Sequence, residues 1–185
     1  MSLPSWTGFF LRSVPVSSNS WPLGTSYKAR LIQQYIKLFT FITKHGAYID
    51  GLAAPQRRNH PENCSARLVL RNEPQWVRQF WLCDIEPEGI LLLNELRNEY
   101  VSLVPQLEIL AGDFNVTIDH ILGSGQITEK TATFALLDQR TFECHWSTVE
   151  KIARHKTGTK IEIFYFFATG WISLNSRHQH ARHIG

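Results

Sequence analysis

Short apolar runs alternate with helix-like segments along most of this chain, and that alternation limits the folds open to it. Because strands that alternate with helices form βαβ units, the pattern predicts a parallel sheet. Near-continuous apolar strands also favour a sheet that is covered on both faces. The predicted strands span residues 47–53, 79–84, 107–113, 131–137 and 160–167, and the predicted helices span residues 27–43, 63–72, 88–100, 116–122 and 147–155.

We therefore expect an α/β fold, namely a three-layer Rossmann-like domain. Its mainly parallel five-stranded sheet should have the order 3-2-1-4-5, with right-handed crossovers and helices on both faces. Proline, glycine and serine punctuate residues 1–25, which predicts an irregular N-terminal arm. Residues 26–170 would form the domain, and residues 171–185 a basic, histidine-rich tail.

The first predicted helix has the helical spacing of an amphipathic segment. Its polar residues, among them Lys28, Arg30 and Lys37, are expected to lie on the side opposite its apolar residues. The apolar set is Leu31, Ile32, Tyr35, Ile36, Leu38, Phe39 and Ile42.

Composition narrows the class of protein. A length of 185 residues and an apolar fraction of 43% fit one globular domain with a sizeable core. No apolar run approaches the length of a membrane span, and the first residues lack the order of a secretory signal, which predicts a cytoplasmic protein with no membrane partner. The cysteines Cys64, Cys83 and Cys144 are isolated in the sequence, so reduced thiols are expected and no metal site.

Four of the five predicted strands end in an acidic residue. These are Asp50, Asp84 (with Glu86 two residues later), Asp113 and Asp138. In a doubly wound sheet the carboxyl ends of the strands lie along one rim, where such folds bind ligands. A carboxylate there can accept hydrogen bonds from ribose hydroxyls or from an amino group. The alternative is that each aspartate caps the next helix or starts a turn.

The loop after the first predicted strand bears on the class of ligand. It reads Asp50-Gly51-Leu52-Ala53-Ala54-Pro55-Gln56-Arg57-Arg58. It contains neither a GxGxxG fingerprint nor a Walker pattern, which disfavours a nicotinamide dinucleotide or a triphosphate. S-adenosylmethionine has no phosphates and makes fewer demands on this loop. Arg57 and Arg58 could contact a nucleic-acid phosphate or a substrate carboxylate, or could simply be solvated.

Two segments carry a resemblance to a known family. Tyr48-Ile49-Asp50-Gly51-Leu52-Ala53-Ala54-Pro55-Gln56 resembles the Tyr-Ile-Asp-Gly-Phe-Ala-Gly-Pro-Gly motif of the three-Cys-motif partner family. Leu136-Leu137-Asp138-Gln139-Arg140-Thr141-Phe142, with Trp146 after it, stands where that family has an apolar strand ending in Asp-Pro-Phe-Gly and then a tryptophan-bearing helix. The resemblance covers about residues 25 to 170. It implies a Rossmann fold of methyltransferase type.

By this resemblance the chain would be a methyltransferase-like protein that binds S-adenosylmethionine, with an unknown methyl acceptor. Asp84 or Glu86 would hold the ribose of the cofactor. Asp113 and Phe114 would contact the adenine. Asp138 would face the acceptor and is the catalytic candidate. The full set assigned to the cofactor is Asp50, Gly51, Ala53, Asp84, Glu86, Asp113 and Phe114.

Departures from the family's pattern keep other functions open. Ala54 and Gln56 stand where the motif has glycines, and a side chain there would crowd a cofactor that packs against the backbone. The chain also stops 18 residues after its last predicted strand, which suggests a divergent or truncated member. A catalytically degenerate domain could bind a partner protein or a nucleic acid, and Arg57 and Arg58 would then matter more than the aspartates. A hydrolase that holds Mg²⁺ between the aspartates of the first and fourth strands is a third reading.

Overall fold

The computed structural model describes residues 23–55, 63–100, 107–139 and 143–166. The predicted N-terminal arm and C-terminal tail lie almost wholly outside these residues, and so do Arg57 and Arg58. The elements are α1 (Leu23–Thr43), β1 (Gly46–Asp50), α2 (Ser65–Leu70), β2 (Val77–Asp84), α3 (Pro87–Tyr100), β3 (Leu107–Ala111), α4 (Phe114–Gly123), β4 (Thr133–Leu137), α5 (Trp146–Arg154) and β5 (Glu162–Tyr165).

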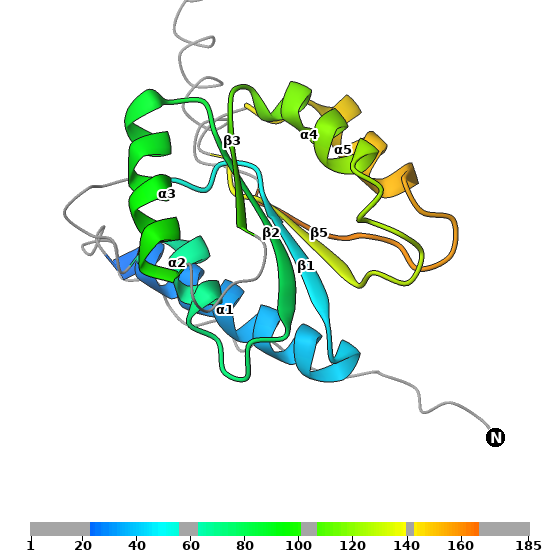
Figure 1. The fold of residues 1–185 in the computed structure, drawn as a ribbon, viewed down its shortest axis with the longest axis horizontal. Helices are drawn as coiled ribbons and strands as arrows, with labels where there is room; N and C mark the ends of the chain where they lie inside the picture. Colours follow the sequence, from blue (N-terminus) through cyan, green and yellow to red (C-terminus); the bar gives the residue numbers. More distant parts are fainter. Residues whose placement is uncertain (1–22, 56–62, 101–106, 140–142, 167–185) are drawn as a thin grey trace, which may run out of the picture.

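The five strands form one parallel sheet in the order β3-β2-β1-β4-β5 (Figure 1). The predicted fold class and strand order are therefore confirmed. β1 lies at the centre, where Ala47 aligns with Gln79 of β2 on one side and with Thr133 of β4 on the other. The chain leaves β1 toward β2 and β3, and it returns to the other side of β1 to form β4 and β5.

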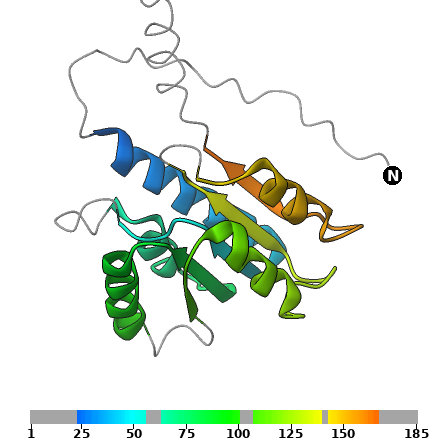
Figure 2. The ribbon, with the colours of Figure 1, turned by 90° about the horizontal axis from the view of Figure 1, so that it is seen from above.

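Helices cover both faces of the sheet (Figures 1 and 2). One core contains side chains from α1, α2 and α3 packed on Tyr48, Phe80 and Phe134. The other contains side chains from α4 and α5 packed on Ile49 and Trp81. Successive residues of each central strand point to opposite cores, and both cores are apolar. The continuous apolar runs in the sequence follow from this double burial.

Helix α1 differs from its prediction. Ile32 and Ile36 are buried against the sheet, as a core-facing stripe requires. The opposite side is mixed, because the predicted polar residues Arg30 and Lys37 are exposed there together with large apolar side chains at 58–79% exposure. The apolar ones are Tyr27, Leu31, Leu38, Phe41 and Ile42. The helix thus has apolar side chains on two sides, and we call the five exposed ones the outer face of α1.

No helix in the described part of the chain is long and apolar enough to cross a lipid bilayer.

Candidate functional site

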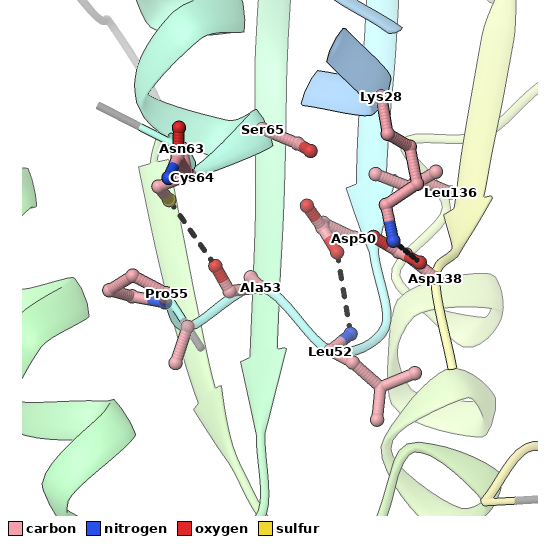
Figure 3. A pocket seen from close by; sticks show the side chains of 11 residues that line it. Lys28, Asp50, Leu52, Ala53, Pro55, Asn63, Cys64, Ser65, Leu136 and Asp138 are labelled. Atoms are coloured by element: carbon pink, nitrogen blue, oxygen red, sulfur yellow. Dashed lines mark hydrogen bonds and ion pairs between the residues drawn. The ribbon is translucent and has the colours of Figure 1, made fainter. Parts of the chain in front are cut away.

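The candidate site lies where the order of the strands reverses, between β1 and β4. In open α/β sheets such a switch point is the usual place for a ligand. A cavity of about 30 Å³ lies there, beside the carboxyl ends of the two strands (Figure 3). The side chains that give it its chemistry are Lys28, Asp50, Asn63, Cys64, Ser65 and Asp138. The structure therefore brings two of the predicted strand-end aspartates, Asp50 and Asp138, to one cavity.

Asp50 is the last residue of β1 and is only 2% exposed. Its carboxylate accepts a hydrogen bond from the Tyr48 hydroxyl at 2.8 Å and one from the Leu52 backbone N–H at 3.3 Å. Burial raises the pKa of Asp50 from 3.8 to about 7, and outweighs the lowering by these two bonds. The nearby charge of Asp138 raises the pKa further. A carboxyl with a pKa near neutrality can exchange a proton or hold a cationic group.

Asp138 follows β4 and forms an ion pair with Lys28. The Lys28 ammonium lies 2.7 Å from the carboxylate, and the two side chains are 17% and 14% exposed. The same ammonium lies 4.3 Å from the centroid of the Phe166 ring. Figure 3 shows Lys28 reaching from α1 to Asp138, with both residues on the side of the cavity opposite Cys64 and Pro55. A cationic ligand at Asp138 would therefore join or displace the Lys28 ammonium.

The other two strand-end aspartates bond to the backbone. One oxygen of Asp84 accepts from the Ala54 N–H at 3.1 Å and the other accepts from the Glu86 N–H at 2.9 Å. Asp113 caps the N-terminus of α4 by accepting from the Asn115 N–H at 2.9 Å. Both residues serve the turn and capping roles weighed as the alternative. Glu86 is exposed, and the roles of all three toward ribose or adenine stay predictions.

Gly51 and Phe114 are in direct contact on the other side of the loop. A β-carbon at position 51 would lie 2.8 Å from the Phe114 ring, a distance that real β-carbons do not reach. Phe114 is 5% exposed and belongs to the core under α4. The glycine is thus required here by packing of an aromatic ring. Ala53, farther along the loop, donates its N–H to the Cys83 carbonyl at 2.8 Å, and its carbonyl accepts from the Cys64 thiol at 3.5 Å.

Gln139 organises the chain after β4, and we did not assign it to the site from the sequence. Its side chain is buried; the amide donates to the Tyr165 hydroxyl at 2.6 Å and accepts from the Cys144 N–H at 3.1 Å. These bonds link Gln139 to Tyr165 of β5 and to Cys144. A polar residue directly after a buried strand was the available signal. Lys28 gave no such signal, because its partner lies 110 residues away.

The buried thiols are poor nucleophiles. Burial raises the pKa of Cys64 to about 11 and that of Cys83 to about 12. The thiolate is the reactive form, so a nucleophilic role at neutral pH is disfavoured for both. Among the described residues, no group of three or more histidine, cysteine, aspartate or glutamate side chains is arranged to hold a metal ion.

No protein-family model, curated protein or solved structure matches this chain. The likeness to the three-Cys-motif partner family therefore stays a prediction that rests on the motif residues.

Proposed function

We propose that this chain is a methyltransferase-like protein that binds S-adenosylmethionine at the switch point between β1 and β4. The observation that carries the proposal is the buried carboxyl of Asp50 at the centre of that switch point, in the same cavity as Asp138 and Lys28. A buried carboxylate is stabilised by a nearby cation. S-adenosylmethionine carries two cationic groups, a sulfonium and an ammonium, and one carboxylate.

The charges of the cavity suit that molecule. The Asp50 carboxylate can receive one cationic group, and the ion pair of Lys28 with Asp138 offers one charge of each sign, which the other charged groups of the ligand would join or displace. In methyl transfer the acceptor's lone pair attacks the methyl carbon while the carbon–sulfur bond breaks, so positioning in line is the main requirement. In this proposal Asp138 faces the acceptor and takes the proton that the acceptor loses.

The test is calorimetric titration of the purified chain with S-adenosylmethionine and S-adenosylhomocysteine. We expect saturable binding of both, and a loss of about tenfold or more for Asp50→Asn. Asp119→Asn is the matched control, because it makes the same charge change at an exposed carboxylate of α4 that pairs with Lys151. If neither compound gives heat or raises the melting temperature of the wild-type chain, the proposal is wrong.

A binding module is the second candidate, and the outer face of α1 favours it. Large exposed apolar side chains that gather on one side of a helix often mark a surface where another molecule binds. The helix also carries Arg30 and Lys37 and has no acidic residue. This favours an acidic partner protein or an anionic nucleic acid near that face.

A further inference from the structure

Exposed apolar side chains form a row along α1. Successive members are four, four, three and four residues apart, so each step returns to nearly the same side of the helix. The row extends for about four turns, or about 22 Å. We call it the apolar row, and its members are Tyr27, Leu31, Tyr35, Leu38 and Ile42, at 39–79% exposure.

The apolar row is held in place from beneath. Ile32 and Ile36 on the opposite side of α1 are 1% exposed and pack in the core. At the edge of the row, the Tyr35 ring lies 5.6 Å from the Phe134 ring of β4. A partner would therefore meet a helix that is already formed and fixed on the sheet, which lowers the entropic cost of binding.

Positive charges flank the apolar row on one side. Arg30 and Lys37 are exposed, and each precedes a leucine of the row by one residue, so both lie about 100° from it on the same flank. Within the described part of the chain, neither forms an ion pair. Lys44, which follows the helix, adds a third charge near Phe41, since its ammonium lies 3.9 Å from the centroid of that ring. α1 itself contains no acidic residue.

This pattern fits a helix of another protein better than a nucleic acid or a second copy. Nucleic-acid bases stack on aromatic rings, whereas Leu31, Leu38 and Ile42 are aliphatic. Apolar side chains at this spacing are those on which helices pack, and flanking charges of one sign select the partner. A second copy of α1 would bring only more positive charge to this face, and like charges oppose such pairing.

We infer that the apolar row of α1 docks an amphipathic helix of a partner protein. The apolar side of that helix packs on Leu31 and Leu38, and its acidic residues lie beside Arg30 and Lys37. The inference rests on the second candidate function, which it makes more specific. It is independent of the binding of S-adenosylmethionine.

The test uses two fluorescently labelled helical peptides, each about three heptads long, with leucine at positions a and d. One peptide has glutamate at positions e and g, and the other has lysine there, so like charges oppose the pairing of either peptide with itself. Anisotropy is measured while the purified chain is added. We expect saturable binding of the glutamate peptide, and binding of the lysine peptide that is weaker by about tenfold or more.

Two variants separate the contribution of charge from that of apolar packing. Lys37→Glu should weaken binding of the glutamate peptide about tenfold and strengthen binding of the lysine peptide. Its control is Lys130→Glu, which makes the same charge change at an exposed lysine before β4. Leu38→Gln should weaken binding of the glutamate peptide about tenfold, and its control is Leu91→Gln, at a leucine of α3 that is 60% exposed. Circular dichroism and melting curves verify that each variant is folded.

The outcomes distinguish the possible occupants of the apolar row. Equal affinity for the two peptides, or wild-type affinity in a folded Leu38→Gln variant, would overturn the inference. Sedimentation that shows a dimer of the wild-type chain, lost in Leu38→Gln, would overturn it in favour of a second copy. If the chain binds a labelled single-stranded oligonucleotide but neither peptide, and Lys37→Glu abolishes that binding, the inference is wrong and the second candidate function stands. Failure to bind any of these probes would overturn both, and titration with S-adenosylmethionine decides the leading proposal separately.

Discussion

Burial of the Asp50 carboxyl makes the stability of the folded chain depend on pH. The pKa is 3.8 for an ordinary aspartate and about 7 in the fold, so the folded state binds this proton more tightly than the unfolded state does. The free energy of unfolding therefore falls as the pH rises between these two values.

We expect Asp50→Asn to remove this dependence. Between pH 5 and pH 8 the wild-type chain should lose about 3 kcal/mol more than the variant, because two units of pH below pH 7 contribute at ~1.4 kcal/mol each. Urea denaturation at both pH values measures the difference, and Asp119→Asn serves as the control. If the free energy of unfolding falls equally in the wild-type chain and in Asp50→Asn, burial does not raise the pKa of Asp50.

Glu129 joins the loop before β4 to the loop before β5. Its carboxylate accepts the N–H groups of Thr157, Gly158 and Thr159 at 2.6, 3.1 and 3.2 Å, and the Thr157 hydroxyl at 3.0 Å. Successive N–H groups that converge in this way bind anions. These bonds lower the pKa of Glu129 from 4.5 to about 2. The stabilisation is complete above the ordinary pKa and is lost as the pH falls through the lowered one.

Glu129→Gln should lower the melting temperature at pH 7, since an amide cannot accept these bonds with the strength of a carboxylate. The deficit relative to the wild-type chain should shrink as the pH falls from about 4.5 toward about 2. Thermal denaturation followed by circular dichroism across this range measures it, with Glu86→Gln as the control at an exposed carboxylate. A deficit that is independent of pH would mean that the carboxylate charge is irrelevant to the contact.

The site could be predicted in part from single residues. An aspartate at the end of a buried strand was a sufficient signal for Asp50 and Asp138, because the topology brings parallel strand ends together. The same signal marks Asp84 and Asp113, whose carboxylates accept backbone N–H groups in the structure and whose roles toward a cofactor stay predictions. Local hydrogen bonding and ligand binding use the same residue types at the same positions, so the sequence alone does not separate them.

At the scale of the elements, the positions of helices and strands follow the sequence to within a few residues, and the exceptions have local causes. The third strand was predicted to reach Asp113 but ends at Ala111. Gly112 has a φ of 133°, which leaves the strand conformation, and Asp113 then caps α4. The two apolar sides of α1 were not predicted, because periodicity identifies a helix but does not say how many of its faces are covered.

The two sides of α1 should respond differently to substitution. Ile36 is 1% exposed, so Ile36→Ala should lower the free energy of unfolding by about 2–5 kcal/mol. Leu38 is 63% exposed, so Leu38→Gln should change it by no more than about 0.5 kcal/mol. Urea denaturation of both variants tests this. A loss at Leu38 comparable to that at Ile36 would show that another surface covers the outer face of α1 in solution.

At the scale of the whole molecule, the fold was predictable because several independent rules agree. Alternating elements, double burial of the strands and right-handed crossovers leave few arrangements, and the observed order β3-β2-β1-β4-β5 is among them. These rules do not predict contacts between side chains that are far apart in the sequence. The ion pair of Lys28 with Asp138 depends on which turn of α1 lies over β4, and packing of the whole chain decides that.

The pairing of β1 with β4 joins parts of the chain that are far apart in the sequence, which matters for folding. β1, β2 and β3 follow one another with one helix between each pair, whereas α2, β2, α3, β3 and α4 lie between β1 and β4 in the chain. Bringing β1 and β4 together therefore closes a longer stretch of chain, and costs more conformational entropy, than pairing β1 with β2 or β2 with β3. A ligand bound between the ends of β1 and β4 would add contacts between these two strands. Its binding free energy would then stabilise the pairing of β1 with β4, and so the association of β4 and β5 with the rest of the sheet.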